Sequence, residues 1–361
     1  MNLHIVPDSK FSDRFYSNLD ELHLLGSNIF IVRSNEQTLK FVRREVPLAK
    51  LYSDEFQKLV GNTMNYEKVF IHQFSPLMYR WVATNSFKEL NWCVWGADVY
   101  NLPGAAKTFY EPMTWTAYSR HTWTADAFYT MKLYLTNMYY RRAAYAKING
   151  VLTWMKSEFE FVLHSLKIPS AEWKFFFYEN DLPYEQLDQF GSTEIGTEGN
   201  LKFILGNSGT DTNNHVDAMA QVAASGIHAD LVLPVSYGSN EYITFLKKRV
   251  SSYKNGSIEF LEQFLAFDKY LKLLMESDGL IMNHLRPQGY GNILTMMYLN
   301  KPVFLNPRNI SISDLDANGL KWIPVEKIGD AKKGMSVQNK DAVRKLLSHD
   351  RLLGTYKELF G

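Results

Sequence analysis

The chain has 361 residues, of which 46% are hydrophobic and 21% charged, a composition that excludes an intrinsically disordered protein and a length that suffices for two domains. Its formal net charge of +1 excludes a global electrostatic field that would recruit nucleic acid. The single cysteine, Cys93, excludes an internal disulfide and a cysteine-based metal site, which predicts a reducing compartment.

The amino terminus and the hydropathy predict a cytoplasmic protein. The opening sequence "MNLHIVPDSKFSDRF" lacks the basic region and the long apolar region of a signal peptide. No uninterrupted apolar run approaches the roughly 18 residues that a membrane-spanning helix needs. We therefore expect a cytoplasmic chain, peripheral on the cytoplasmic face of the inner membrane if it meets a membrane at all.

Short apolar runs alternate with helical patterns over the first half of the chain. Apolar runs of strand length cover residues 2–6, 27–32, 68–74, 90–95, 149–154 and 173–178. Between them, apolar spacing predicts helices over 45–60 and 76–87. This alternation favours a mostly parallel α/β sheet with helices on both faces.

Aromatic and basic residues are concentrated between positions 109 and 148. This stretch mixes Tyr, Trp and Phe with Arg120, Lys132, Arg141 and Arg142. One interpretation is a helical pair whose aromatic face packs into its own domain. The other is an interfacial surface, where amphipathic rings lie at headgroup level and the cations meet anionic lipid phosphates. The sequence leaves both interpretations open.

A polar, acidic and glycine-containing stretch over residues 179–200 separates two α/β halves, and its residues 186–200 form the predicted linker. The second half repeats the alternation, with strands expected at 201–206, 229–238, 257–264, 279–284 and 301–306. The predicted domains therefore cover residues 1–185 and 201–340, followed by a helix over 341–361. We expect two Rossmann-like domains that face each other across a cleft, lined by the loops that follow the strands.

The first of two candidate phosphate-binding loops is Gly206-Asn207-Ser208-Gly209, between a strand and a helix. Glycine lets the backbone approach a ligand closely, and the free N–H groups of a helix start favour an anion. The loop matches neither the Walker pattern nor GxGxxG. By itself it is also compatible with an ordinary surface turn.

The second loop, "HLRPQGYGN" over residues 284–292, repeats this arrangement. Gly289 and Gly291 flank the start of a helix, and Arg286 precedes it as a fixed cation suited to phosphate. Two such loops in one domain predict a site for a nucleotide diphosphate. The pattern x-G-x-G-N, helix, N-K-P-V is also typical of the donor half of nucleotide-sugar transferases with two Rossmann-like domains.

The first half offers three candidate proton acceptors at strand ends. Asp98 follows the strand at 90–95, His72 closes the strand at 68–74, and Asp8 follows the first strand. A carboxylate or imidazole at these places could accept a hydroxyl proton. The structural alternatives are a loop or cap aspartate for Asp98, a buried histidine for His72 and a turn residue for Asp8.

The histidines show no spacing that suggests a metal site. No HxxxH or HxH pattern is present, so no metal cofactor is expected. His215, in the first phosphate-loop region, is expected to lie near the ligand at a helix start rather than to act as the catalyst.

Several stretches together resemble one known family. They are "FIHQFSP", "WGADVYNL", "ILGNSG", "NNHVDAM", "VLPVSYGSNEYI", "LAFDKYLKLLMESD" and "RPQGYGN...PVFLN". In this order they are similar to the bacterial TDP-N-acetylfucosamine:lipid II N-acetylfucosaminyltransferases, a 4-alpha-L-fucosyltransferase group that transfers Fuc4NAc in enterobacterial common antigen synthesis. The resemblance covers residues 68–306 and is most specific at "WGAD", "GNSG" and "QGYGN". The sequence differs from that pattern at 104–135 and 179–200.

The resemblance implies a GT-B type glycosyltransferase that uses a dTDP-sugar donor and a polyprenyl-diphosphate-linked saccharide acceptor, needs no metal and associates peripherally with the membrane. The donor would occupy the domain at 201–340 and the acceptor the domain at 1–185. Asp98 would contact the acceptor hydroxyl, with His72 and Asp8 as second choices, and one of them would act as base if the anomeric configuration inverts.

The resemblance also assigns the donor-binding residues by position. Those expected at the diphosphate and sugar are Gly206, Asn207, Ser208, Gly209, Arg286, Gln288, Gly289, Tyr290, Gly291 and Asn292. Those expected at the nucleoside are Pro234, Ser236, Tyr237 and Phe264, the last at the border of a thymine pocket. Three alternatives remain: a GT-B transferase that uses a UDP- or GDP-sugar and another acceptor, a nucleotide-sugar-binding protein without turnover, and a two-domain epimerase acting on a UDP-sugar.

Overall fold

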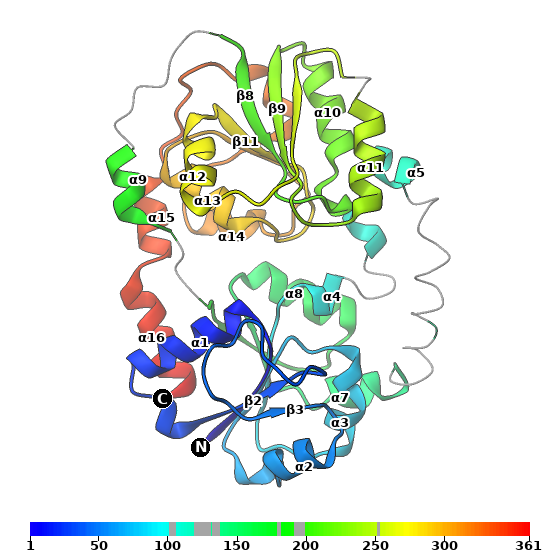
Figure 1. Ribbon diagram of the computed structural model, residues 1–361, viewed down its shortest axis with the longest axis vertical. Helices are drawn as coiled ribbons and strands as arrows, with labels where there is room; N and C mark the ends of the chain where they lie inside the picture. Colours follow the sequence, from blue (N-terminus) through cyan, green and yellow to red (C-terminus); the bar gives the residue numbers. More distant parts are fainter. Residues whose placement is uncertain (101–105, 119–130, 132–137, 179–181, 191–198, 251–252) are drawn as a thin grey trace. The chain divides into compact units, whose positions relative to one another are not determined.

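The computed structural model describes residues 1–100, 106–118, 131, 138–178, 182–190, 199–250 and 253–361 (Figure 1). The chain divides into two compact units. Unit 1 comprises Met1–Ala105, Ala125–Asn180 and Leu347–Gly361, and unit 2 comprises Ala106–Thr124 and Asp181–Leu346. Each unit is built on one parallel sheet, as the alternating sequence pattern predicts.

Unit 1 contains a seven-stranded sheet with the order β3-β2-β1-β4-β5-β6-β7. All its pairs are parallel, and His4 of β1 aligns with Phe30 of β2 and Phe70 of β4. The strands are β1 (Asn2–Pro7), β2 (Asn28–Arg33), β3 (Leu48–Ala49), β4 (Val69–His72), β5 (Leu90–Cys93), β6 (Gly150–Thr153) and β7 (Glu172–Phe175). The central strands β4, β5 and β6 are buried along their whole length, as expected for a parallel sheet covered on both faces.

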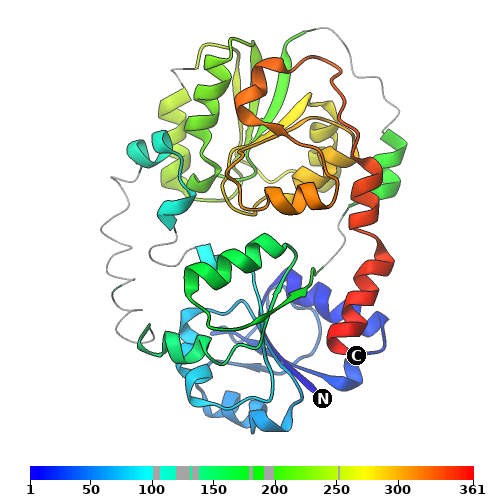
Figure 2. The same cartoon turned by 180° about the vertical axis from the view of Figure 1, so that it is seen from behind.

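Helices cover both faces of this sheet (Figures 1 and 2). They are α1 (Lys10–Glu21), α2 (Asp54–Val60), α3 (Tyr79–Thr84), α4 (Ala97–Tyr100), α7 (Arg141–Tyr145), α8 (Lys156–Leu166) and α16 (His349–Phe360). Ser9, Ser53 and Ser348 begin α1, α2 and α16 because each serine oxygen accepts an N–H of the first turn. Phe360 of α16 packs edge-on against Phe15 of α1, so the carboxyl terminus completes the core of unit 1.

Unit 2 contains a six-stranded parallel sheet with the order β10-β9-β8-β11-β12-β13. Its strands are β8 (Leu201–Leu205), β9 (Ala229–Pro234), β10 (Ile258–Leu261), β11 (Gly279–Met282), β12 (Val303–Leu305) and β13 (Ile323–Pro324). Its helices are α5 (Pro112–Tyr118), α9 (Tyr184–Phe190), α10 (His215–Ala224), α11 (Asn240–Arg249), α12 (Phe267–Glu276), α13 (Tyr290–Tyr298), α14 (Ile312–Ala317) and α15 (Lys340–Leu346).

The expected helix over 45–60 is only partly correct. Leu48 and Ala49 form β3, which pairs with Val32 and Arg33 of β2. The chain then turns through Tyr52, whose φ of +69° is incompatible with a continuous helix, and α2 begins after Ser53. The apolar spacing there reflects an edge strand followed by a helix.

The expected helix over 341–361 is interrupted. The side chain of Ser348 accepts the backbone N–H of Arg351 and begins a new helix, α16. The break coincides with the boundary between the units, because α15 belongs to unit 2 and α16 to unit 1. The predicted linker also differs, since Tyr184–Phe190 forms α9 of unit 2, while residues 191–198 lie outside the described part of the chain.

A segment of the first half of the sequence belongs to unit 2, which changes the predicted boundary at residue 185. Figure 1 shows α5, coloured cyan like its neighbours in sequence, beside α10 and α11 of unit 2. Tyr118 at the end of α5 packs edge-on against the buried Tyr242 of α11, with ring centroids 4.9 Å apart. This aromatic contact holds the segment in the core of unit 2.

Part of the aromatic stretch at 109–148 lies outside the described residues, including Arg120 and Lys132. In the remainder, Tyr118 and Tyr145 are buried, and Tyr139 is 85% exposed. Within the described ranges, no helix is both long and apolar enough to cross a bilayer.

Candidate functional site

The strand order creates a topological switch point in unit 2 between β8 and β11. The chain runs from β8 outward to β9 and β10, then returns to the other side of β8 with β11 and continues outward to β12. The loops that follow β8 and β11 therefore leave the sheet in opposite directions, and open α/β sheets bind ligands at this position. Both candidate phosphate-binding loops begin here.

The loop after β8 needs its glycines. Gly206 has φ +74°, and a Cβ there would lie 2.7 Å from His215 Nε2 and 2.9 Å from Asn213 Oδ1. Gly209 bridges to Gly238 in the loop after β9, and a Cβ on Gly238 would lie 2.4 Å from the Gly209 backbone. The backbone of this loop is thus packed against its neighbours with no room for side chains at these positions.

Gln288 connects the two loops of the switch point. Its Nε2 donates to Asn207 Oδ1 at 3.0 Å and to Thr210 Oγ1 at 3.0 Å. Its Oε1 accepts from the hydroxyl of Thr212 at 3.1 Å, and Arg286 Nη2 donates to the same hydroxyl at 3.2 Å. The structure thus brings Asn207, Arg286 and Gln288 together, as the sequence predicts.

Gly289 allows this approach. It has φ +64°, and a Cβ there would lie 2.4 Å from Met282 Cε and 3.0 Å from Asn207 Cγ. Within the part of the chain that the structure describes, no side chain caps the amino end of α13, which begins directly after Gly289. The positive end of that helix dipole is therefore available to an anion beside the Gln288 contacts.

Of the other predicted residues of this loop, Tyr290 and Asn292 form hydrogen bonds with residues outside the loop after β8. The hydroxyl of Tyr290 donates to Ser311 Oγ, and Asn292 Nδ2 donates to the Tyr270 hydroxyl at 2.7 Å. A Cβ on Gly291 would have no atom within 4 Å, so this glycine lies on an open surface of α13.

Exposed aromatic rings lie beyond the ends of β9 and β10. Tyr237 is 51% exposed and Phe264 81% exposed, with ring centroids 6.4 Å apart. Asn207 Nδ2 donates to the Tyr237 hydroxyl at 3.0 Å, which ties this pair to the loop after β8. Pro234 is the buried last residue of β9, and Ser236 is half-buried in the turn that follows.

The amino end of α10 is occupied by the protein itself, which the sequence does not predict. The N-cap residue Asn214 accepts the N–H of Glu111 at 2.9 Å and donates from Nδ2 to the carbonyl of Phe109 at 3.1 Å. Asp217 in the first turn accepts from the backbone N–H groups of Met113 and Thr114, each at 2.8 Å. Of the two helix starts predicted to face an anion, that of α10 is covered by the segment before α5, whereas that of α13 has no side-chain cap among the described residues.

Three residues near the switch point of unit 2 were not predicted from the sequence. Glu111 belongs to the segment before α5, and Asn306 and Arg308 follow β12. The Glu111 carboxylate accepts from Asn306 Nδ2 at 2.6 Å and forms an ion pair with Arg308. A polar "NPRN" turn after an apolar strand was the available signal for the last two, whereas no local pattern marks Glu111.

His215 and His284 are completely buried within unit 2. Burial lowers the pKa of each to about 3, and for His284 the neighbouring Arg286 adds to this effect. In each, Nε2 has no hydrogen-bond partner among the described residues. His215 is the first residue of α10, at a helix start as the sequence predicts, and its neutral side chain lies next to Gly206.

In unit 1, Asp98 connects two strand-end loops. Its carboxylate accepts from the Phe74 N–H at 2.8 Å, the Trp92 indole at 2.7 Å and the Trp95 N–H at 3.0 Å, and it is 3% exposed. Burial raises its pKa, and these donors act in the opposite direction. Since both oxygens are engaged and covered, the geometry indicates a structural role, which differs from the predicted contact with an acceptor.

His72 lies within a buried chain of polar groups. It shares a hydrogen bond with His4 at 3.2 Å, and its Nδ1 is 2.7 Å from the Tyr178 hydroxyl, which accepts from the Trp95 indole. Burial lowers its pKa well below the ordinary value, and the nearby His4 and Arg33 contribute. Without exposed surface, this imidazole has the packing role that was the alternative to a proton acceptor.

Asp8 follows β1 at the switch point of sheet A but holds a loop. Its oxygens accept the N–H groups of Lys40 at 2.6 Å, Phe41 at 3.0 Å and Val42 at 3.0 Å. Partial burial raises its pKa, but these donors outweigh burial and hold the pKa below the ordinary value. The contacts agree with its alternative interpretation as a turn residue.

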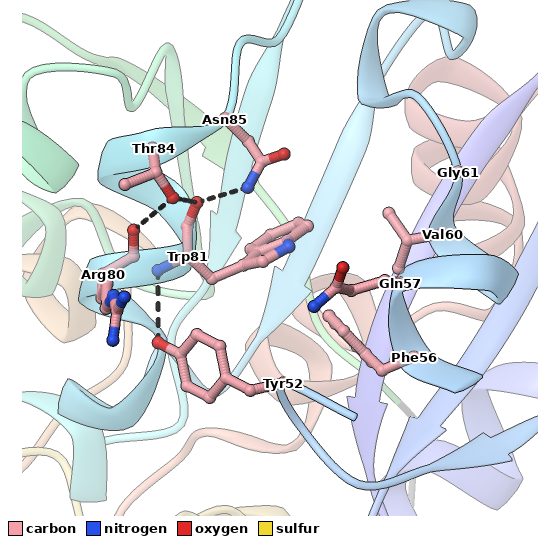
Figure 3. A pocket seen from close by; sticks show the side chains of 9 residues that line it. All are labelled: Tyr52, Phe56, Gln57, Val60, Gly61, Arg80, Trp81, Thr84 and Asn85. Atoms are coloured by element: carbon pink, nitrogen blue, oxygen red, sulfur yellow. Dashed lines mark hydrogen bonds between the residues drawn. The ribbon is translucent and has the colours of Figure 1, made fainter. Parts of the chain in front are cut away.

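A hollow of about 650 Å³ lies in unit 1 between α2 and α3 (Figure 3). Its lining residues are Tyr52, Phe56, Gln57, Val60, Gly61, Arg80, Trp81, Thr84 and Asn85. The Tyr52 hydroxyl donates to the Leu77 carbonyl at 2.7 Å and accepts from the Trp81 N–H at 3.2 Å, so the ring is fixed at the rim. Within the described ranges, no carboxylate pairs with Arg80.

No group of three or more His, Cys, Asp or Glu side chains could hold a metal ion, as far as the described residues extend. The absence of a metal requirement stays a prediction.

Comparisons with known proteins agree with this architecture. Residues 109–352 match the model of a family described as 4-alpha-L-fucosyltransferase, glycosyl transferase group 56. Among solved structures, sucrose-phosphate synthase from Thermosynechococcus elongatus is similar, with 11% identity and a TM-score of 0.63 over 100% of this chain and 98% of that chain. The lipopolysaccharide outer core galactosyltransferase WaaB has 7% identity and a TM-score of 0.59 over 99% and 98%.

A UDP-forming alpha,alpha-trehalose-phosphate synthase from Burkholderia xenovorans has 8% identity and a TM-score of 0.56 over 100% and 98%. At these identities the structures share the fold. That fold is the GT-B type with two Rossmann-like domains, as predicted.

Proposed function

Because the chain belongs to the 4-alpha-L-fucosyltransferase family, glycosyl transferase group 56, we propose that it transfers a Fuc4NAc-like 4-acetamido-4,6-dideoxyhexose from a dTDP-sugar to a polyprenyl-diphosphate-linked saccharide. The chain is a glycosyltransferase of the GT-B type. The sugar, the nucleotide, the lipid-linked acceptor and a role in enterobacterial common antigen synthesis are the proposed parts.

The observation that carries the proposal is the convergence of Gln288, Asn207 and Arg286 at the switch point of sheet B. A diphosphate there would meet the loop after β8, the guanidinium of Arg286 and the uncapped start of α13. Backbone N–H groups, a cation and a helix dipole stabilise negative charge that develops on a leaving diphosphate. These groups can act without a metal ion.

The nucleoside would lie against the exposed pair Tyr237 and Phe264. A base stacks on an aromatic face, and these two exposed rings lie on one side of the proposed diphosphate site. Pro234 and Ser236 would border the same space at the end of β9. In this proposal the nucleotide would lie on the β8–β10 side of the site and the sugar beside Gln288.

The acceptor would use unit 1. The hollow between α2 and α3 has a volume in the range of ligand sites, and its aromatic, amide and guanidinium groups are those that bind saccharides and phosphates. Replacing Arg80 by alanine should raise the KM for the acceptor and leave the KM for the donor unchanged. An unchanged acceptor KM would remove this hollow from the proposal.

A calorimetric titration with dTDP, UDP and GDP tests the donor assignment. We expect dTDP to bind most tightly and to stabilise the protein by about 2.7 kcal/mol at one hundred times its dissociation constant. If UDP or GDP binds more tightly than dTDP, the proposed nucleotide is wrong, although the transferase function stands.

Product analysis separates the transferase from the other functions that the fold permits. Incubation with dTDP-Fuc4NAc and a polyprenyl-diphosphate disaccharide should release dTDP and yield an extended lipid-linked product. An epimerised nucleotide sugar without dTDP release, or tight binding without turnover, would contradict the proposal.

Peripheral membrane association is part of the proposal because the acceptor is lipid-linked. The described remainder of the 109–148 stretch presents Arg142 and the exposed Tyr139, a cation and a ring of the type that binds anionic headgroups. Co-sedimentation with anionic vesicles at low salt tests this. A protein that stays in the supernatant would contradict the association.

A further inference from the structure

Arg308 stands at the carboxyl edge of sheet B, next to the loop that contains Arg286. Asn309 Nδ2 donates to the carbonyls of His284 at 2.9 Å and Arg286 at 3.3 Å, and the Ile310 N–H donates to the Leu285 carbonyl at 3.2 Å. The loops after β11 and β12 are therefore one hydrogen-bonded unit. Two arginines belong to that unit.

The backbone of Arg308 is fixed by a hydrogen bond, whereas most of its side chain is exposed to solvent. The turn is fixed because the Arg308 N–H donates to Asn306 Oδ1 at 2.9 Å. One guanidinium nitrogen pairs with Glu111, yet the side chain is 61% exposed. A guanidinium has five N–H donors in a planar fork, so several remain for a ligand.

Glu111 is largely buried, and both its backbone and its side chain form hydrogen bonds within unit 2. Its side chain is 12% exposed, against 61% for Arg308. Its N–H donates to Asn214 Oδ1 at 2.9 Å, and its carboxylate accepts from Asn306 Nδ2 at 2.6 Å. Asn306 Nδ2 also donates to Asn283 Oδ1 at 2.8 Å, so the carboxylate is fixed to the ends of both β11 and β12.

We propose that Arg308 is a second cation for the donor diphosphate, and that Glu111 is the residue that positions it. The inference rests on the proposed nucleotide-sugar site and adds the ligand group that Arg308 contacts. Glu111 comes from the segment before α5, so a piece of the first half of the sequence completes the donor site of unit 2. Planar, bidentate contact with phosphate oxygens is the chemistry for which arginine is suited.

Titration calorimetry with dTDP, dTMP and thymidine tests the role of Arg308. In Arg308→Ala we expect dTDP to bind about 10- to 100-fold more weakly, with thymidine binding unchanged, and Arg308→Lys to recover part of the loss. Arg344→Ala is the matched control, because Arg344 is an exposed arginine of unit 2 that pairs with Asp188. Its dTDP affinity should change by less than about twofold.

A double-mutant cycle tests the positioning role of Glu111. Glu111→Gln should weaken dTDP about 3- to 10-fold in the wild-type background and have no effect in the Arg308→Ala background. A merely structural role would weaken binding equally in both backgrounds. That result would overturn the role of Glu111.

Two further outcomes would overturn the role of Arg308. One is unchanged dTDP affinity in Arg308→Ala, including the case in which only the acceptor KM rises. The other is an equal loss for thymidine, which carries no phosphate. If wild type prefers UDP or GDP, the proposed donor fails, but the same variants tested with that nucleotide still decide on Arg308.

Discussion

Asp217 accepts two hydrogen bonds from Thr114, one from the backbone N–H at 2.8 Å and one from the hydroxyl at 2.6 Å. The two residues are 103 positions apart in the sequence, and both are buried. This pair attaches α5, from the first half of the chain, to the helix that follows the candidate phosphate loop. It explains why residues 106–118 fold with unit 2.

Asp217→Ala should lower the free energy of unfolding by about 2–4 kcal/mol, because it leaves three donors without an acceptor, two of them on the buried Thr114. Urea denaturation measures this. Asp341→Ala is the control, since Asp341 is an exposed aspartate in the first turn of α15. It should change stability by no more than about 0.5 kcal/mol, and equal losses in both variants would contradict the role of Asp217.

Gly289→Ala and Gly291→Ala should have opposite effects on stability. An alanine at Gly289 would need φ +64° and would meet Met282 Cε at 2.4 Å, so we expect a loss of at least about 1–2 kcal/mol. At Gly291, inside α13 and in open space, alanine should add about 0.5–1 kcal/mol. Thermal unfolding without ligand measures both, and a stabilised Gly289→Ala would contradict the positive φ at this position.

Asp98→Asn should reduce stability more than catalysis. The amide would place an N–H group against donors that now bind the carboxylate, at a cost of about 2–4 kcal/mol. Below its melting temperature, the variant should keep kcat within about tenfold of wild type, whereas losing a general base costs about 100-fold or more. A larger loss of kcat in a folded variant would restore Asp98 as the proton acceptor.

Transfer should not depend on a divalent metal ion. The proposed site supplies Arg286 and the backbone N–H groups at the start of α13 for the charge on the leaving diphosphate. Chelation with EDTA should leave the rate unchanged, and added Mg²⁺ or Mn²⁺ should not raise it. A rate that EDTA abolishes and Mg²⁺ restores would contradict the expectation.

Stability should fall as the pH falls from 7.5 to 5.5. His4, His215 and His284 keep a pKa near 3 when folded but titrate near 6.5 when unfolded, so below 6.5 the unfolded state binds more protons. Each contributes a loss of about 1.4 kcal/mol at pH 5.5. Urea denaturation at both pH values checks this, and the His215→Gln variant should show a difference smaller by about 1.4 kcal/mol.

Local patterns predicted most of the strands and the switch-point loop. The apolar run at 201–206 became β8, and the glycines at 206 and 289 adopt the positive φ values for which glycine is favoured. The same patterns could not separate a carboxylate that meets substrate from one that holds a loop. Asp8 and Asp98 are examples, because the N–H groups that satisfy them come from residues up to 34 positions away.

The sequence by itself determined the α/β class, the two halves and the glycine-bearing loops, because periodicity and glycine conformation are properties of neighbouring residues. Only the tertiary structure decided three features. They are the strand order that places the loops after β8 and β11 side by side, the burial of His72, and the membership of the segment before α5 in unit 2. Those features depend on contacts between residues far apart in the sequence, such as that of Glu111 with Asn306, which are 195 positions apart. Such contacts form because polar groups that folding buries need hydrogen-bond partners.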